Sequence, residues 1–228
     1  MKVLRSVGGG VRTQIRRQYY KHVYARQENP DTSLLGRVIS SWGEGVGDNP
    51  APAELWNEQY RKGKWDRLLD DSNMLKAGIA VTWIRRRQTS PDILDVGCGN
   101  GAIIRSLRGG DYHAYLGIDL SSAAIESLSE IDTSNAVFRV ADAESVVFDQ
   151  EFDVIVFNDS LYCLPEPVSQ FERYVQYLAR GGTMLVSTYG LSDRASAVLR
   201  KITRMHPPID QVTISRGEKY WTWTMFEA

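Results

Sequence analysis

Residues 93–101 constrain the fold of this chain more than any other part of its sequence. An apolar run ends at Asp95, and three glycines follow at alternate positions. Residues 102–107 then carry apolar side chains at helical spacing. The pattern predicts a buried strand, a tight turn and a helix start. Glycine lets such a turn approach a ligand closely, and the free N–H groups of the helix start face the same place, so we expect a nucleotide-like cofactor there.

Short apolar strands and helices alternate along the rest of the chain. The spacing predicts strands over 93–96, 114–118, 136–140, 154–157 and 183–188, and helices over 102–107, 122–130, 167–178 and 193–204. Two last strands, 210–215 and 219–226, flank a turn and predict an antiparallel hairpin. This order predicts an α/β fold with a doubly wound, Rossmann-like, mostly parallel seven-stranded sheet and a C-terminal antiparallel hairpin.

Two more helices are expected before the first strand, over 53–61 and 73–88. Ser72 is placed to cap the second helix, and Leu75, Ile79 and Trp83 recur every four residues along it. This spacing predicts that these three side chains form the buried face of the helix.

The N-terminal residues differ in composition from the remainder. Residues 11–26 predict a basic amphipathic helix, and the segment 27–53 is rich in proline and glycine. We therefore divide the chain into an N-terminal basic helical extension with a linker, residues 1–52, and a main domain, residues 53–228. A docked helix, a lid over the site, contact with a membrane surface or nucleic acid, and a homodimer contact all stay open for the extension.

Charge and cysteine content restrict the partners. The net charge is −1, and acidic residues outnumber basic ones after the N-terminal extension, which disfavours a nucleic-acid partner. Cys98 and Cys163 match no metal or disulfide pattern, so we expect no metal site and a reducing cytoplasmic location. No run is apolar enough to predict a membrane span, and no signal peptide is recognisable.

Acidic or amide residues follow each of the first four predicted strands, and carboxyl ends of parallel strands meet at one edge of the sheet. Asp95 can attract an ammonium or sulfonium, Asp119 can accept hydrogen bonds from ribose hydroxyls, and Asp142 can accept one from an adenine amine. Asn158 and Asp159 follow the fourth strand. For each acid alone, a solvated turn or a helix cap is the alternative.

A dinucleotide site is the competing interpretation. Gly97-x-Gly99-x-x-Ala102 matches a relaxed dinucleotide fingerprint, and Asp119 would serve as its ribose acid. Asp95 opposes this interpretation because a carboxylate before the turn repels a pyrophosphate. An NAD-dependent oxidoreductase nevertheless stays an alternative.

The chain resembles the class I S-adenosylmethionine-dependent methyltransferases. Residues 93–101, Gly117-Ile118-Asp119-Leu120-Ser121 and Ala141-Asp142-Ala143-Glu144 are similar to the three cofactor motifs of that family, and residues 178–185 resemble its step into strand five. Trp56, Tyr60 and Trp65 resemble the aromatic segment of its small-molecule members. The resemblance implies S-adenosylmethionine as cofactor, S-adenosylhomocysteine as product, and contacts from these residues: Tyr60, Trp65, Asp95, Gly97, Gly99, Asn100, Gly101, Asp119, Leu120, Asp142, Ala143 and Asn158.

We expect a small-molecule methyl acceptor. The segment 158–161 lacks the Asn-Pro-Pro-Tyr type motif of nucleic-acid amino methyltransferases, which favours O-methylation of a sugar or secondary metabolite. An alcohol needs a general base, and Asp159 is the first candidate, followed by Tyr162 and Tyr189. A small-molecule N-methyltransferase and an inert methyltransferase-like binding module are the alternatives.

Two tryptophans on the last predicted strand could belong to the core or to the site. Trp221 and Trp223 alternate on one face of that strand. We expect both to be core residues rather than a platform for a substrate.

Overall fold

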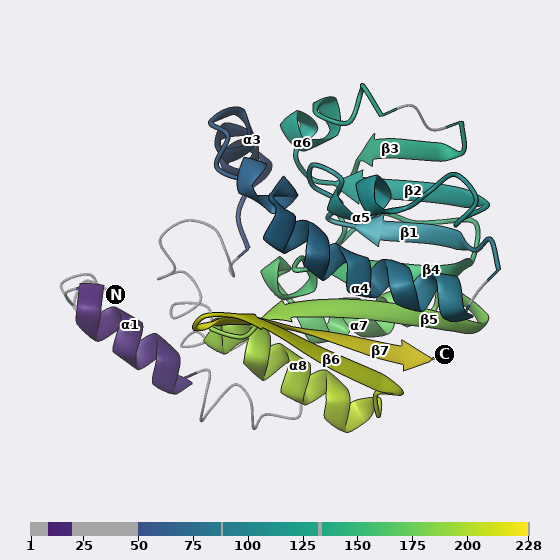
Figure 1. The fold of residues 1–228 in the computed structure, drawn as a ribbon. Coiled ribbons are helices and arrows are strands. Elements are labelled where there is room, and N and C mark those ends of the chain that lie inside the picture. Colours follow the sequence, from purple (N-terminus) through teal and green to yellow (C-terminus); the bar gives the residue numbers. More distant parts are fainter. Residues whose placement is uncertain (1–8, 20–49, 88, 132–133, 228) are drawn as a thin grey trace.

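A seven-stranded sheet forms the centre of the molecule (Figure 1). The computed structural model describes residues 9–19, 50–87, 89–131 and 134–227. The strand order is β3-β2-β1-β4-β5-β7-β6, in which neighbours among the first five strands are parallel and β7 is antiparallel to β5 and β6. The strands are β1 (Asp92–Val96), β2 (Ala114–Asp119), β3 (Ala136–Val140), β4 (Phe152–Asn158), β5 (Leu178–Tyr189), β6 (Asp210–Arg216) and β7 (Lys219–Glu227). The predicted fold class is confirmed.

Helices cover both faces of the sheet because each strand of the centre is apolar on both sides. One hydrophobic cluster joins α4 and α5 to the sheet, and a second joins α7 and α8 to its other face. The helical segments are α1 (Gly9–Gln18), α3 (Ala53–Arg61), η4 (Asp66–Leu69), α4 (Asp71–Arg87), α5 (Ala102–Ser106), α6 (Ser122–Glu126), η5 (Leu161–Cys163), α7 (Pro167–Val175) and α8 (Asp193–Met205).

The strand order reverses between β1 and β4, where the chain crosses from one side of the sheet to the other. The connections leaving these two strands therefore diverge and leave a crevice at their carboxyl ends. In Figure 1 the strands β1 to β4 point toward the side on which α3 lies. This edge is where the sequence places its polar residues.

Helix α4 differs from the prediction in its cap and in its buried face. The helix begins at Asp71, so Ser72 lies inside it, and Asp70 precedes it with its Oδ1 accepting a hydrogen bond from the backbone N–H of Asn73 at 3.2 Å. Leu75 is 68% exposed, whereas Lys76, Ala80 and Ile84 are buried. Of the three side chains predicted for the buried face, Trp83 is buried and Ile79 is partly buried against the core, so only Leu75 was placed wrongly. The prediction missed that a lysine lies on the face that packs against the sheet.

Strand β5 is longer than predicted. It begins at Leu178, which pairs with Phe152 of β4, whereas the sequence predicted a helix up to 178 and a strand from 183. The register between β4 and β5 shifts near their start, so the two glycines at 181 and 182 lie within an irregular strand instead of ending a helix.

The N-terminal helix α1 is described up to residue 19, so the remainder of the predicted 11–26 helix and the linker lie outside the described residues. Tyr19 is buried and belongs to the cluster on the α7 and α8 face, while Val11 and Ile15 are exposed. The division of the chain at residue 52 stays a prediction. None of the described helices is both long and apolar enough to cross a membrane.

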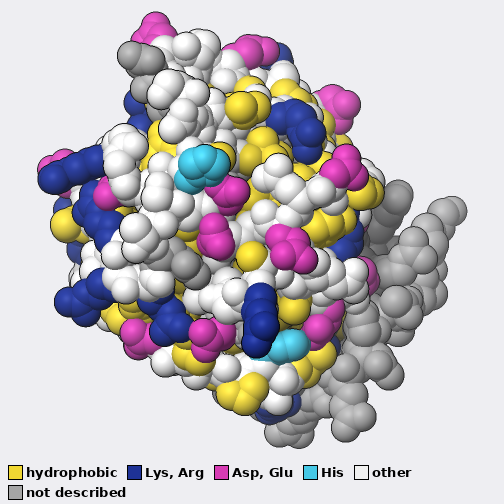
Figure 2. All heavy atoms as spheres, turned by 90° about the vertical axis from the view of Figure 1, so that its right-hand side faces the viewer, with side chains coloured by type: hydrophobic (Ala, Val, Ile, Leu, Met, Phe, Trp, Pro, Cys, Tyr) yellow, Lys and Arg dark blue, Asp and Glu magenta, His cyan; other side chains and the backbone are white. Residues whose placement is uncertain are grey.

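The face at the amino ends of the parallel strands carries side chains of both charge signs, interspersed with apolar ones (Figure 2). Such a mixture does not create a field of one sign on this face. The polar groups that the sequence singles out lie at the other edge of the sheet.

Asn57 connects α3 to α6, and this contact generates a prediction. Its Oδ1 accepts hydrogen bonds from the Ser121 hydroxyl at 2.8 Å and from the backbone N–H of Ala123 at 3.1 Å. Asn57→Ala should loosen α3, because each lost hydrogen bond is worth about 1 kcal/mol. We expect amide hydrogen exchange in α3 to accelerate about tenfold. Glu54→Ala, at an exposed position of the same helix, is the control. Equal exchange rates in both variants would contradict the role of Asn57 in holding α3 against α6.

Candidate functional site

A cavity of about 1020 Å³ opens at the carboxyl ends of the strands. This volume is at the upper end of the range for small-molecule sites, so it can hold a cofactor with a second molecule. Its lining includes most of the predicted site residues, namely Tyr60, Trp65, Gly97, Gly99, Asn100, Asp119, Leu120, Asp142, Ala143, Asn158, Asp159 and Tyr162. Asp95 lies behind the wall, and Gly101 faces the side chains of Leu128 and Ile104 instead of the cavity.

The glycine turn passes closely between neighbouring elements. Gly97 has φ 73°, and a Cβ there would lie 2.6 Å from the Cβ of Ser160, which follows β4. A Cβ on Gly99 would lie 2.7 Å from the hydroxyl of Tyr60 on α3. Only glycine fits at both positions, so β1, the loop after β4 and α3 meet around one stretch of backbone.

Asp95 is a buried carboxylate with an unfilled hydrogen-bonding position. It is 1% exposed, its Oδ2 accepts a hydrogen bond from the Tyr115 hydroxyl at 2.5 Å, and its Oδ1 has no partner among the described residues. Burial raises the pKa of Asp95 to about 7, although the Tyr115 hydrogen bond opposes the rise. A cationic ligand group beside this carboxylate would compensate its charge.

Asp119 lines the cavity with both oxygens anchored to the backbone. Its Oδ2 accepts from the N–H of Gly99 at 2.9 Å and its Oδ1 from the N–H of Ser121 at 2.8 Å. Burial raises the pKa of Asp119, and these backbone donors lower it. Each oxygen keeps a second lone pair, so the carboxylate can accept two hydroxyl groups from a ligand.

Aromatic residues of α3 and the segment after it cover the glycine turn. The ring of Trp65 lies 5.8 Å from that of Trp56 and 6.3 Å from that of Tyr60, measured between centroids. The side-chain amide of Asn100 donates to the backbone oxygen of Trp65 at 3.0 Å. Trp65 is 8% exposed, and its Nε1 has no hydrogen-bond partner among the described residues. Beside the glycine turn there are thus two buried groups without a hydrogen-bond partner among the described residues, the Trp65 N–H in the wall and the Asp95 Oδ1 behind it.

Asp142 and Ala143 line the cavity beyond Asp119. Asp142 is exposed, and its Oδ1 accepts from the backbone N–H of Glu144 at 2.9 Å, so it caps a turn. The backbone oxygen of Ala143 accepts from Tyr174 at 2.9 Å, which fixes the loop. Capping and ligand binding are compatible here, because a carboxylate has acceptor positions left.

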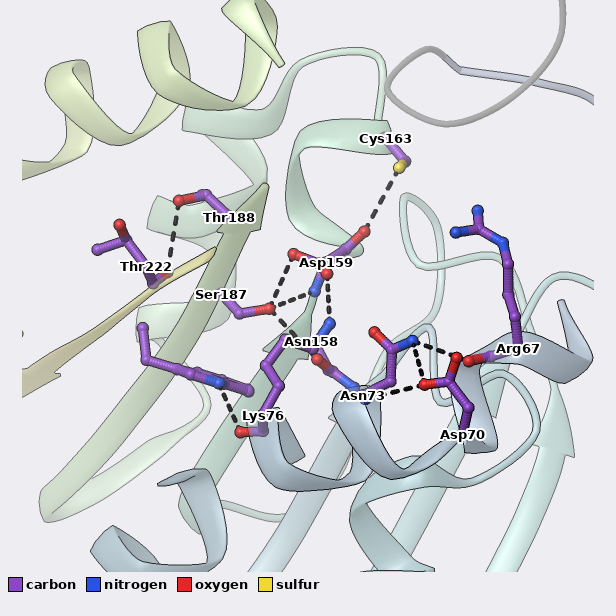
Figure 3. A network of polar contacts seen from close by, with 11 residues as sticks. Arg67, Asp70, Asn73, Lys76, Asn158, Asp159, Cys163, Ser187, Thr188 and Thr222 are labelled. Carbon is purple, nitrogen blue, oxygen red and sulfur yellow. Dashed lines mark hydrogen bonds and ion pairs between the residues drawn. The ribbon is translucent and has the colours of Figure 1, made fainter. Parts of the chain in front are cut away.

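A charged network occupies the other end of the cavity (Figure 3). Asp159 follows β4 with φ 56°, a conformation that is uncommon for a residue other than glycine. Its backbone N–H donates to the hydroxyl of Ser187 at 2.8 Å, and this hydroxyl donates to the Asp159 carboxylate at 3.0 Å. The other carboxylate oxygen forms an ion pair with Lys76 of α4. Asp159 is thus held in one orientation by β5 and α4.

Sequence reasoning missed Lys76, and it placed Trp221 wrongly. The only signal for Lys76 was a lysine next to the apolar positions of α4, at a one-residue offset from the predicted stripe. Trp223 is fully buried as predicted, and its Nε1 donates to the backbone oxygen of Lys76 at 2.9 Å. Trp221 is half-buried and lines the cavity, 5.3 Å from the ring of Tyr189 between centroids. The prediction of Trp221 as a core residue was therefore wrong, because the strand extends beyond the core.

The remaining candidates have clear positions. Tyr162 lines the cavity and is buried, and Arg194 of α8 donates to its backbone oxygen at 2.7 Å. His113 precedes β2 and pairs with Asp92, which starts β1, at the edge opposite the cavity.

Burial raises the pKa of the Cys98 thiol, so this cavity residue is not a reactive thiolate. Within the described residues, no group of His, Cys, Asp and Glu is arranged to hold a metal ion.

Comparison with known proteins identifies a family. The sequence matches the family model described as "Methyltransferase domain" over residues 89–226. Phosphoethanolamine N-methyltransferase 1 of Arabidopsis thaliana is 29% identical over 154 residues, 59% of this chain and 30% of that protein. Ubiquinone biosynthesis O-methyltransferase of Pseudomonas putida (strain W619) is 30% identical over 145 residues, 58% of this chain and 60% of that protein. The chain thus spans less than two thirds of the length of these relatives.

Solved structures share the fold at low identity. The N-methyltransferase NodS from Bradyrhizobium japonicum WM9, in complex with S-adenosyl-L-homocysteine, has a TM-score of 0.63 at 16% identity, covering 75% of this chain and 97% of that one. The [4+2]-cyclase SpnF has a TM-score of 0.59 at 16% identity, covering 81% and 98%. The architecture is therefore shared by proteins whose names describe different reactions.

The buried carboxylate of Asp95 predicts a pH-dependent stability. Its pKa rises from 3.8 in the unfolded chain to about 7 in the folded protein, so the folded protein binds the proton more tightly. Its ionisation therefore destabilises the fold as the pH rises between these two values, and the cost is constant above them. From pH 5 to pH 8 the wild type should lose about 2–3 kcal/mol more than Asp95→Asn. Urea unfolding at both pH values measures this difference. Equal losses of unfolding free energy in the two proteins would contradict a raised pKa at Asp95.

Proposed function

The chain belongs to the methyltransferase-domain family, and on this premise we propose that it transfers a methyl group from S-adenosylmethionine to a small-molecule acceptor. S-adenosylhomocysteine is then the second product. The observation that carries the proposal is a pair of unsatisfied buried groups beside the glycine turn, the Oδ1 of Asp95 and the Nε1 of Trp65. One is an acceptor with negative charge and the other is a donor, which matches a ligand that carries both an ammonium and a carboxylate.

The residues at this end of the cavity fit the parts of that cofactor. Asp95 would compensate the positive charge of the amino-acid part, and Trp65 would donate to its carboxylate. Asp119 offers two anchored oxygens to ribose hydroxyls. Leu120, Asp142 and Ala143 line the cavity beyond it and would surround the adenine. The acidic lining opposes the interpretation as a dinucleotide site, because it repels a pyrophosphate.

The bound cofactor supplies a methyl group that its sulfonium activates toward a nucleophile. The protein's contribution is to align the acceptor with that methyl group and to exclude water. Asn158 and Asp159 line the cavity at the carboxyl end of β4. Asp159 is the first candidate to accept a proton from an acceptor hydroxyl, because its carboxylate is oriented and 19% exposed. Tyr162 is the second candidate.

Oxygen is the acceptor atom that we propose, with nitrogen as the alternative. The relatives include O-methyltransferases and N-methyltransferases, so family membership does not select between them. The oriented carboxylate of Asp159 favours oxygen, since a hydroxyl must lose a proton during transfer. The acceptor we propose is a sugar or another secondary metabolite.

The cellular context follows from composition and charge. We infer a cytoplasmic location from the two cysteines, which form no disulfide pattern. No nucleic-acid partner is expected, because the chain after its N-terminal extension is acidic. For the basic extension, residues 1–52, we propose a homodimer contact, with a lid over the site as the alternative.

Ligand binding tests the proposed function directly. S-adenosylhomocysteine should raise the thermal midpoint of the protein, since it binds the folded state alone. At 100 times its Kd the stabilisation is about 2.7 kcal/mol. NAD measured at the same concentrations should leave the midpoint unchanged. Stabilisation by NAD alone would replace the proposal with an oxidoreductase, and binding of neither ligand by the folded protein would favour an inert binding module.

Trp65 allows a test of the assigned orientation of the cofactor. Trp65→Phe keeps an aromatic ring and removes the N–H, so the affinity for S-adenosylhomocysteine should fall about tenfold or more. The affinity for 5′-methylthioadenosine, which lacks the amino-acid part, should stay the same. Isothermal titration calorimetry of both ligands on both proteins measures the difference. An equal loss for the two ligands would show that Trp65 acts on the adenosine part or on the fold.

A further inference from the structure

We propose that the acceptor is a hydroxylated aromatic ring, a phenol, which packs against Trp221 and presents its hydroxyl to the Lys76–Asp159 ion pair. The inference rests on the proposed function and narrows its acceptor to one chemical class, selecting an aromatic secondary metabolite and no longer a sugar. It depends on two features at the same end of the cavity, an aromatic platform and a buried charge pair.

The platform consists of Tyr189 and Trp221, the facing residues of β5 and β7. Their ring centroids are 5.3 Å apart with an interplanar angle of 35°, and both residues line the cavity and are half-buried. Each ring therefore keeps part of its surface open to the cavity. An aromatic surface of this kind favours a planar ligand ring, because such a ring buries apolar surface against it and stacks on it at the same time.

The charge pair lies beside this platform. The Nζ of Lys76 is 5.7 Å from the ring centroid of Trp221 and is ion-paired with Asp159. The side chain of Lys76 is 3% exposed and that of Asp159 is 19% exposed, so a ligand meets the carboxylate first and the ammonium lies behind it. A ring against Trp221 would thus carry its hydroxyl toward Asp159.

Charge balance at this pair selects the type of hydroxyl. If Asp159 takes a proton from the acceptor, it becomes neutral, and the buried ammonium of Lys76 loses its counter-ion. The negative charge that compensates this ammonium then has to be on the acceptor oxygen, next to the protonated Asp159. A phenol loses its proton near pH 10, as the tyrosine side chain does, whereas an aliphatic hydroxyl, like water, has a far higher pKa. A phenolate can carry this charge far more readily than a sugar alkoxide can.

The step balances in atoms and electrons. The O–H bond of the phenol breaks, its proton passes to the Asp159 carboxylate and then to solvent, and the electron pair stays on the oxygen. This pair forms the new O–CH₃ bond while the bond between the methyl carbon and the sulfur breaks, and the sulfur keeps that electron pair. Lys76 takes no part in the proton transfer and acts as a positioning residue, which holds Asp159 through their ion pair.

The test uses methyl transfer from radiolabelled S-adenosylmethionine to a series of substituted catechols and phenols of graded acidity. Methyl glucoside and phosphoethanolamine are the comparison acceptors. We expect transfer to the phenols and none to the other two. Lys76→Met should lower kcat about 100-fold, the effect of removing one donor that stabilises an oxyanion. The loss should be greatest for the least acidic phenols, and Lys76→Arg should restore activity in part.

A second variant tests the platform. Trp221→Ala should raise the KM for phenols about tenfold with a smaller change in kcat, because it removes a binding surface and no charge. Lys62→Met is the control, since Lys62 is 69% exposed, pairs with Glu58 and does not line the cavity.

Several results would overturn the inference. Transfer to methyl glucoside or phosphoethanolamine but to no phenol would do so, as would no transfer to any phenol by a protein that binds S-adenosylhomocysteine. The latter result would leave the cofactor proposal intact, whereas loss of S-adenosylhomocysteine binding would remove both. Equal losses in Lys76→Met and Lys76→Arg, independent of phenol acidity, would show a purely structural role for Lys76.

Discussion

The burial of one carboxylate near the end of β1 is the constraint on which the site depends. Desolvation of an ionised group costs several kcal/mol, and the Tyr115 hydroxyl satisfies only one oxygen of Asp95. The site is electrostatically incomplete without a cation beside it. The glycine turn brings backbone close to this point, and Asp119 is fixed through the N–H of Gly99. The elements that surround the cofactor end are thus arranged around a charge that the fold alone does not compensate.

The two ends of the cavity are built by different parts of the chain. The end to which we assign the cofactor is lined by β1, β2, the loop after β3 and the aromatic residues around α3. The end to which we assign the acceptor is lined by α4, the ends of β4 and β5, and the β6–β7 hairpin. Proteins of this architecture can therefore keep one end and change the other, which agrees with relatives whose names describe methyl transfer to nitrogen and to oxygen.

The sequence allowed most of the fold to be predicted, and most of the residues that line the cavity around the glycine turn, because those features are local. Strand, glycine turn and helix start lie within residues 93–107, and each following acid comes directly after an apolar strand. Lys76 was missed because its partner, Asp159, is 83 positions away and because helical periodicity left the buried face of α4 uncertain by one residue. Trp221 was misjudged because alternation along a strand gives its face but not the point where the core ends.

The contact between Trp223 and α4 has a consequence for the order in which the site can form. The indole N–H of Trp223 donates a hydrogen bond to the backbone oxygen of Lys76. Strand β7 lies between β5 and β6. A growing chain could close the cofactor end once β1 to β4 have paired. The acceptor end must wait until β7 has inserted between two strands that precede it in the chain. A chain that has folded only as far as β5 would hold the methyl donor without a surface to align its target.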